Sequence, residues 1–196
     1  FNQAFNCDPV GAFGGVIVCN YKVGHETAKE INKKFFEVVV AKDFDSKALS
    51  ILKRKKNLRI IKNNQKYDTS EIVFHSLSKN FIFQNTDNYN FNKTNFKVVS
   101  KKKPNKKVFN DLIFAFNICR FVKSNAIVLT NDCSTVGIGS GQPSRLDSCE
   151  IAVNKMKKYN HKIDNLVAAS DAFFPFVDGL EKLVQSGVKA IVQPFG

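Results

Sequence analysis

GVIVCNYKVGHETAKEINKKFFEVVVAKDFDSKALSILKRKKNLRII (residues 15–61) alternates short apolar runs with segments of helical periodicity. The apolar runs are rich in Val and Ile, which is typical of buried strands, and they lie at residues 15–20, 37–41 and 58–61. The segments between them carry their apolar side chains on one helical face and lie at residues 25–35 and 46–56. Strands and helices that alternate over short connections indicate an α/β fold with some parallel pairing.

The rest of the chain repeats both patterns after a weaker stretch. Residues 62–107 are crowded with Lys and Asn, and they contain two candidate strands, at residues 71–75 and 95–100. Further strands are predicted at residues 125–130, 134–138, 166–169 and 189–192. Helices are predicted at residues 108–122, 144–159 and 179–186. Residues 131–133 (Asn-Asp-Cys) favour a tight hairpin turn between the first two of these strands.

The composition favours a globular protein of the cytoplasm. The chain has 196 residues, and its hydrophobic content of 43% is too high for a disordered protein. No stretch approaches the roughly 18 uninterrupted apolar residues of a membrane span, and the N-terminus lacks the pattern of a signal peptide. The five cysteines form no C-x-x-C pair, which argues against a zinc ribbon or a disulfide framework and favours a reducing compartment.

Both ends of the sequence look interrupted. Residue 1 is Phe, and residues 1–5 have the character of the last turn of a helix. At the other end, residues 188–192 predict a strand that leads directly into the last residues of the sequence. We therefore expect an internal fragment of a longer protein.

The net charge of +13 suggests a polyanionic partner. The densest basic runs are residues 53–56 and 101–107, but most of the charge comes from Lys spread along the chain. A general drift of the composition toward Lys, Asn, Ile and Phe would produce the same charge without any nucleic-acid role. A small substrate that bears a phosphate would also suit a positive field. A basic nucleotide- or nucleic-acid-binding module without catalysis stays open as an alternative.

GIGSGQPSR (residues 137–145) joins a predicted strand to a predicted helix through a glycine-rich turn. Glycine lets backbone N–H groups approach a ligand closely, and the first N–H groups of a helix attract anions. Ser144 can cap the helix, whereas Arg145 places a cation where it opposes the helix dipole. Either an anion lies between Arg145 and the helix end, or the helix is simply capped and Arg145 is exposed.

Two other segments are candidates for a binding site. ASDAFFPFVD (residues 169–178) follows a predicted strand, where α/β proteins place ligands. Its three phenylalanines either stack on a planar heterocycle or fill the core: Phe173, Phe174 and Phe176. DPVGAFGG (residues 8–15) makes a defined turn that either contacts a ligand or is structural. The histidines share no neighbourhood with a candidate nucleophile: His25, His75 and His161.

Three blocks together carry a resemblance to a known family: DPVGAFGG (8–15), KSNAIVLTNDCSTVGIGSGQPSRLDS (123–148) and SDAFFPFVDG (170–179). In this order and at these spacings, they resemble the transformylase domain of the bifunctional purine enzymes. That domain formylates aminoimidazole carboxamide ribonucleotide (AICAR), and the same enzymes carry inosine monophosphate cyclohydrolase. Weaker similarity covers residues 25–41 and 48–61, and residues 62–107 are the least similar.

The resemblance implies a cytidine-deaminase-like, three-layer α/β fold, used twice in an obligate homodimer with active sites at the subunit interface. The implied organisation is the end of a first lobe at about residues 1–66, a middle segment at 67–162 and the start of a second lobe at 163–196. A cyclohydrolase domain is not expected in this sequence. The zinc signature of deaminases, H-x-E with a downstream P-C-x-x-C, does not occur, so we expect no metal.

The resemblance also implies roles for individual residues. Asn125 and Arg145 match residues that hold the AICAR nucleotide, and Asn125 is the candidate catalytic residue. Further nucleotide contacts are implied for Gly14, Glu37 and Phe173, and contacts on the folate side for Leu146 and Asp178. Two positions depart from the common pattern, because family members can carry Asp at the position of Glu37 and often carry Gly at that of Phe195.

The implied reaction transfers a formyl group from 10-formyltetrahydrofolate to the 5-amino group of AICAR. That amine is a poor nucleophile, since its lone pair is delocalised, so the reaction needs proton removal and stabilisation of a tetrahedral intermediate. A Lys-His pair does most of this in the family, and its place lies upstream of residue 8. We therefore expect this chain to bind AICAR and 10-formyltetrahydrofolate as part of a larger enzyme but to be inactive alone, with no nucleic-acid or membrane partner.

Overall fold

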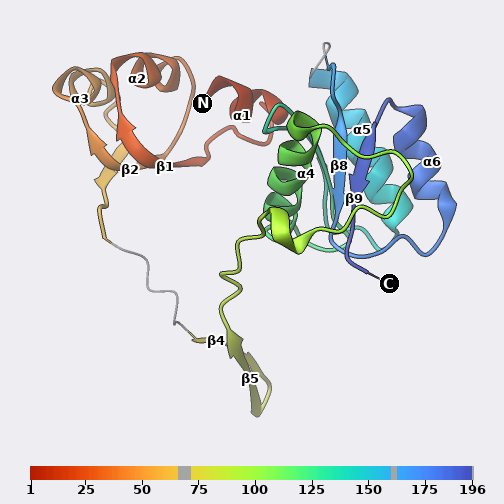
Figure 1. The fold of residues 1–196 in the computed structure, drawn as a ribbon. Helices are drawn as coiled ribbons and strands as arrows, with labels where there is room; N and C mark the ends of the chain where they lie inside the picture. The colour runs from red at the N-terminus through yellow and green to blue at the C-terminus, as the bar shows by residue number, and fades with distance from the viewer. Residues whose placement is uncertain (66–71, 160–162, 196) are drawn as a thin grey trace. The chain divides into compact units, whose positions relative to one another are not determined.

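The computed structural model describes residues 1–65, 72–159 and 163–195, and it divides into two compact units (Figure 1). One unit comprises residues 14–90, and the other comprises residues 1–13 with residues 91–196. His161, Glu71 at the start of a predicted strand, and Gly196 lie outside the described residues. No helix in the described ranges has the length and apolar character needed to cross a membrane.

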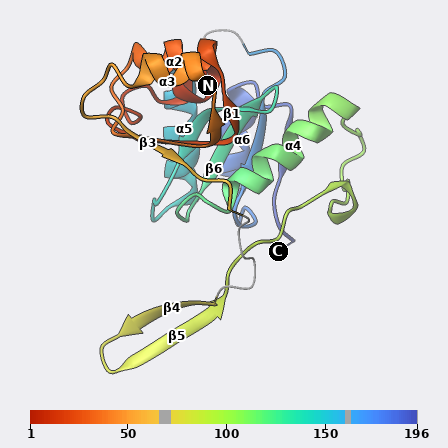
Figure 2. The ribbon, with the colours of Figure 1, turned by 90° about the vertical axis from the view of Figure 1, so that its left-hand side faces the viewer.

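The unit of residues 14–90 contains the parallel sheet that the opening stretch predicts. Its strands pair in the order β1-β2-β3, with bounds β1 (Val16–Val23), β2 (Val38–Phe44) and β3 (Arg59–Lys62). Helices α2 (His25–Asn32) and α3 (Ser46–Leu52) lie side by side over one face of the sheet (Figures 1 and 2). Their core contains fully buried side chains from every layer: Val23, Ala28, Ile31, Val39 and Leu52. The prediction of α/β alternation with parallel pairing is therefore confirmed.

Asp45 stabilises the starts of both helices in this unit. Its Oδ1 accepts a hydrogen bond from the backbone N–H of Ala48 at 2.6 Å, in the first turn of α3. Its Oδ2 accepts another from the N–H of His25 at 3.1 Å, at the start of α2. One carboxylate thus satisfies an N–H group of each helix that would otherwise lack a partner.

Residues 72–85 form an antiparallel hairpin of strands β4 (Ile72–Leu77) and β5 (Asn80–Asn85), seen side by side in Figure 2. The sequence indicated the first strand but not the second. On one face, Phe74 lies opposite Phe83 and Ser76 lies opposite Phe81. These aromatic side chains are exposed, by 68% for Phe74, 74% for Phe83 and 68% for Phe81.

The strand predicted at residues 95–100 is wrong. A short 3-10 helix, η1 (Lys93–Asn95), occupies its start, and residues 96–100 are irregular. Asn92 and Asn95 exchange hydrogen bonds in a capping box. Phe96 then packs edge-on against Phe116 of the next helix, with ring centroids 5.6 Å apart. Side-chain capping and aromatic packing thus replace the strand hydrogen bonds.

The second unit is a mixed four-stranded sheet with helices on both faces (Figure 1). Its strands pair in the order β7-β6-β8-β9, with bounds β6 (Ile127–Asn131), β7 (Ser134–Gly139), β8 (Val167–Ser170) and β9 (Ala190–Val192). Its helices are α1 (Asn2–Cys7), α4 (Lys106–Cys119), α5 (Arg145–Tyr159) and α6 (Val177–Gln185). All the strands and helices predicted after residue 107 are present, with small shifts at their ends.

Alternating residues of β6 and β8 build two separate cores in this unit. Ile127 and Leu129 pack with α5 and α6, whereas Val128 packs with α4. Val167 faces α4 and Ala168 faces the other two helices, in the same alternation. The unit is therefore a three-layer α/β/α arrangement.

The β6–β7 turn is the tight hairpin that the sequence predicts. Asp132 and Cys133 have φ values of +55° and +53°, as a turn of the primed type requires. The buried carboxylate of Asp111, on α4, accepts hydrogen bonds from their backbone N–H groups at 2.7 and 3.1 Å. Helix α4 thus stabilises the β6–β7 turn through the carboxylate of Asp111.

Candidate functional site

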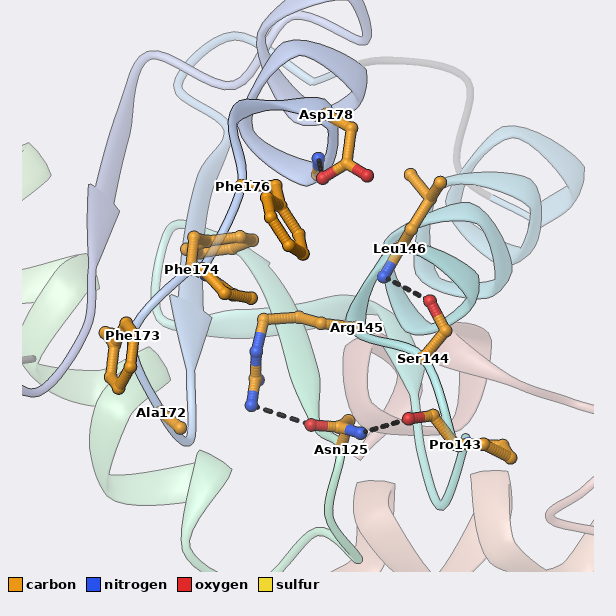
Figure 3. Close-up of a pocket in the computed structure, with 12 residues that line it drawn as sticks. Asn125, Pro143, Ser144, Arg145, Leu146, Ala172, Phe173, Phe174, Phe176 and Asp178 are labelled. Carbon is orange, nitrogen blue, oxygen red and sulfur yellow. Dashed lines mark hydrogen bonds between the residues drawn. The ribbon is translucent and has the colours of Figure 1, made fainter.

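A pocket of about 390 Å³ opens where three strand ends of the four-stranded sheet meet (Figure 3). Such a volume lies within the range of about 300–1,000 Å³ that is usual for small-molecule sites. Ile127, at the start of β6, pairs with Gly139 at the end of β7 and with Ser170 at the end of β8. The segments that adjoin these ends, which the sequence singled out separately, therefore converge on one place.

Arg145 is the central polar residue of this pocket. One terminal nitrogen of its guanidinium, Nη1, donates to Asp171 Oδ1 at 2.5 Å and to Ser170 Oγ at 2.8 Å. The other, Nη2, donates to Asn125 Oδ1 at 2.7 Å (Figure 3). The side chain is only 11% exposed, so the exposed arginine of the simple-cap interpretation is not what the structure shows. The anion beside Arg145 is the carboxylate of Asp171.

Asp171 is ionised in this setting. Burial by itself would raise the pKa of Asp171, but hydrogen bonds from the Ser124 hydroxyl and the Arg145 guanidinium hold it below its usual value. The backbone N–H of Ala126 also donates to Asp171 Oδ1, at 3.0 Å. The sequence analysis included Asp171 in the candidate segment of residues 169–178 but did not connect it with Arg145. The only signal available was the neighbouring Ser-Asp pair at a strand end.

Asn125 ties the glycine-rich turn to the start of β6. Its side-chain nitrogen donates to the carbonyl oxygens of Gln142 and Pro143, both at 2.9 Å. Its Oδ1 accepts from Arg145, which takes one of the two lone pairs of an amide oxygen. The expected cap is present as well, because Ser144 Oγ accepts from the N–H of Leu146 at 3.1 Å. Asn125 therefore orders the pocket wall as well as facing the pocket.

The three phenylalanines of residues 169–178 all line the pocket, and one of them also packs on the core. Phe174 packs on the core beneath α5 and α6, and its ring centroid lies 6.0 Å from Arg145 Cζ. Phe173 and Phe176 line the pocket and are exposed by 47% and 74% (Figure 3). Phe174 lines the pocket as well, so it takes part in both the core and the pocket wall, whereas Phe173 and Phe176 are the exposed aromatic side chains.

The remaining side of the pocket is formed by the starts of α5 and α6. Leu146 and Asp178 both line it, and Asp178 lies in the first turn of α6. Five of the seven predicted site residues therefore line this one pocket: Asn125, Arg145, Leu146, Phe173 and Asp178.

The other two predicted site residues, Gly14 and Glu37, lie next to each other in the unit of residues 14–90. Gly14 has a φ of +69°, which an L side chain rarely adopts. A Cβ at Gly14 would lie 3.9 Å from Glu37 Oε1. The two residues therefore form a pair of their own.

The turn at residues 8–13 is fixed by Asp8. Its Oδ1 accepts from the N–H of Gly11 at 2.9 Å, and its Oδ2 pairs with Lys155 Nζ of α5 at 2.6 Å. The hydrogen bond from Lys155 holds the pKa of Asp8 below its usual value. The turn is thus anchored to the helix that begins at Arg145.

Two of the cysteines, Cys119 and Cys149, lie close enough to the pocket for Arg145 to affect the pKa of their thiols. All five cysteines are free thiols, and burial raises the pKa of both Cys119 and Cys149 to about 12, so these two stay protonated at neutral pH. Within residues 1–65, 72–159 and 163–195, no three His, Cys, Asp or Glu side chains are grouped to hold a metal ion.

Comparison with known proteins gives a consistent family. The family model described as AICARFT/IMPCHase bienzyme matches residues 1–155. The bifunctional purine biosynthesis protein PurH of Aquifex aeolicus (strain VF5) is 40% identical over 199 residues, covering 100% of this chain and 38% of the relative. PurH of Thermoanaerobacter sp. (strain X514) is 43% identical over 194 residues, covering 99% of this chain and 37% of the relative. The chain thus spans between a third and two fifths of the length of these curated relatives.

Proposed function

The chain belongs to the AICARFT/IMPCHase bienzyme family, and on that premise we propose that it forms part of a site for formyl transfer to AICAR. The formyl donor is 10-formyltetrahydrofolate, and the acceptor is the 5-amino group of AICAR. The observation that carries this proposal is the single pocket in which Asn125, Arg145 and Phe173 meet Leu146 and Asp178. One side of this pocket is polar and aromatic, and the other is formed by the starts of two helices. The two sides can hold two ligands whose reacting groups must be in contact.

In this proposal the nucleotide lies against Arg145, Asn125 and the ring of Phe173. The guanidinium and the amide supply hydrogen bonds, and the exposed aromatic face supplies stacking for a planar heterocycle. Nucleotide contacts of Gly14 and Glu37 are proposed from the family resemblance alone. The folate lies on the side of Leu146 and Asp178.

We propose that the described residues lining the pocket bind the ligands and that they do not carry out the proton transfers. Among the described residues that line it, the ionisable side chains are Arg145, which is always charged, and Asp178. The weakly nucleophilic amine must lose a proton during the reaction, and the family resemblance assigns that step to a Lys-His pair rather than to either of these side chains. We therefore propose that the proton-transfer groups come from other parts of the longer protein. This chain alone should then give no formylated product in a steady-state assay with AICAR and 10-formyltetrahydrofolate.

The larger architecture is proposed on the same basis. The α/β/α layering of strands β6 to β9 with helices α4, α5 and α6 supports a cytidine-deaminase-like lobe. A second lobe of this kind, the lobe limits near residues 66 and 162, and a homodimer with shared active sites follow from the family resemblance. Sedimentation of the intact protein, with and without ligands, tests the dimer.

Arg145→Ala in the intact protein tests the assignment of the nucleotide side. We expect the Kd for AICAR to rise by about 30- to 150-fold, since hydrogen bonds from a charged group are worth about 2–3 kcal/mol. The Kd for tetrahydrofolate should change less than about threefold, which also shows that the variant is folded. Both constants are measured by isothermal titration calorimetry.

Lys157→Ala is the matched control, because Lys157 is an exposed cation on the same helix, α5. It should leave both affinities unchanged. An equal loss of both ligands in Arg145→Ala would contradict the assignment, and so would an unchanged affinity for AICAR.

A further inference from the structure

We propose that Asp171 is a positioning residue that fixes the guanidinium of Arg145 and cancels its charge, so that the pocket accepts an uncharged hydrogen-bonding group there and rejects an anion. This inference rests on the proposed function, because it concerns the same pocket. It assigns a role to a residue that acts through Arg145 and does not line the pocket itself.

Asp171 restricts the guanidinium to one orientation. Arg145 Nη1 is shared between Asp171 Oδ1 and Ser170 Oγ, and Nη2 is bound by Asn125. These contacts use three of the five N–H groups of a guanidinium. The acceptors come from the end of β8 and the start of β6, which are paired strands. The guanidinium therefore cannot rotate without breaking hydrogen bonds to both strands.

Asp171 is itself held in place. Its Oδ1 accepts from the N–H of Ala126, while its own N–H donates to the carbonyl oxygen of Ala126 at 3.3 Å. The Ser124 side chain supplies a further hydrogen bond. A group that must hold another in position needs such support from rigid elements, and here a strand end and its neighbour supply it.

The pair is also nearly neutral as a unit. The side chains of Arg145 and Asp171 are exposed by only 11% and 17%, and their charged atoms are 2.5 Å apart. At that distance and burial, the carboxylate offsets most of the field of the cation. A ligand anion brought to Arg145 would face Asp171 at close range and lose hydration. An uncharged acceptor would gain the free guanidinium N–H groups without that cost.

Asp171→Asn in the intact protein removes the charge but keeps the shape and a carbonyl acceptor. We expect inorganic phosphate, tested as a competitor of AICAR, to bind at least about tenfold more tightly than to the unmodified protein. The Kd for AICAR should rise by about five- to thirtyfold, because an amide holds the guanidinium less firmly. A purely structural role would lower the melting temperature without changing the preference between the two ligands.

Asp147→Asn is the control for a general charge effect, since it removes an exposed carboxylate from the first turn of the same helix. It should change neither constant by more than about twofold. Asp171→Glu separates the two parts of the role: with the charge kept and the position altered, AICAR should bind more weakly while phosphate binds as before. This variant also decides the matter if Asp171→Asn fails to fold.

Unchanged phosphate affinity in Asp171→Asn would overturn the charge-balancing role, and unchanged AICAR affinity in Asp171→Glu would overturn the positioning role. These failures differ from failure of the proposed function, in which the unmodified protein itself would not bind AICAR.

Discussion

Gly137 and Gly139 allow strand β7 to lie directly on helix α5. A Cβ at Gly139 would stand 1.9 Å from the carbonyl oxygen of Ser148, and one at Gly137 would stand 2.2 Å from that of Ala152. Both distances are far inside van der Waals contact, and the opposing atoms are backbone that cannot rotate away. The absence of two side chains thus sets where α5 runs, and with it where Arg145 begins that helix.

Gly139→Ala should therefore destabilise the protein, although it adds a single methyl group. Forcing an atom into a filled space costs about 3 kcal/mol at such a contact, and the helix would have to move. The measurement is urea unfolding followed by circular dichroism. Gly24→Ala is the control, because its Cβ would lie 3.5 Å from the Asp45 carboxylate, an ordinary contact. Equal stability of the two variants would refute the interpretation of a close backbone approach.

At the scale of elements, the two helices of the N-terminal sheet depend on one side chain. Asp45 accepts the N–H of Ala48 in α3 and the N–H of His25 in α2. Because α2 and α3 also pack side by side, loss of this carboxylate weakens two neighbouring elements together.

Asp45→Ala should lower the free energy of unfolding by about 2 kcal/mol, near the upper end of the range for a single cap, since two helix starts lose an acceptor. Asp45→Asn keeps an acceptor for one of the N–H groups and should lose about half as much. Thermal denaturation of both variants gives the comparison. A loss below about 0.5 kcal/mol in Asp45→Ala would show that the second contact contributes nothing.

Regular elements were predictable from the sequence where local pattern and tertiary packing agree. The parallel sheet, the later helices and the Asp132-Cys133 turn all follow from periodicity and turn chemistry. Strand β5 was missed because Asn80 and Asn85 bound a short run without clear alternation. The strand expected at residues 95–100 failed because packing of Phe96 on α4 is a contact between distant residues.

The candidate site shows the same division. Its motifs were recognisable one by one, since glycine-rich turns and strand ends are local features. The pairing of Arg145 with Asp171 was not, because the partners are 26 residues apart and meet only through the pairing of β6 with β8. The pairing of strands in the sheet decides whether an arginine is exposed or bound by a carboxylate. The spacing of residues in the sequence does not predict that pairing.

At the scale of the whole molecule, ionised carboxylates pair with some of the many cationic side chains. The chain carries +13, and hydrogen bonds from Lys155 and Lys62 hold the pKa values of Asp8 and Asp43 below their usual range. The pKa of Asp171 is also lowered, although burial by itself would raise it. Their protonation would both break these contacts and add positive charge to a molecule already rich in it.

Acid should therefore destabilise the protein. A carboxylate whose pKa is lower in the folded state stabilises the fold above its unfolded pKa, about 3.9 for Asp. That stabilisation is lost as the pH falls from about 5 through the folded pKa. Urea midpoints at pH 7, 5, 4 and 3 should be similar at the first two values and then fall. Asp171→Asn should fall less steeply than Asp147→Asn, and a flat profile down to pH 3 would contradict this account.

The β4–β5 hairpin has a consequence for aggregation and chaperone binding during synthesis of the chain. Its fourteen positions from 72 to 85 include one formal charge, Lys79, and both strands expose large apolar side chains. A short, nearly uncharged segment of high β-propensity is the kind that seeds aggregation and that holdase chaperones retain. We therefore expect this hairpin to be a binding site for holdase chaperones while the chain is being synthesised.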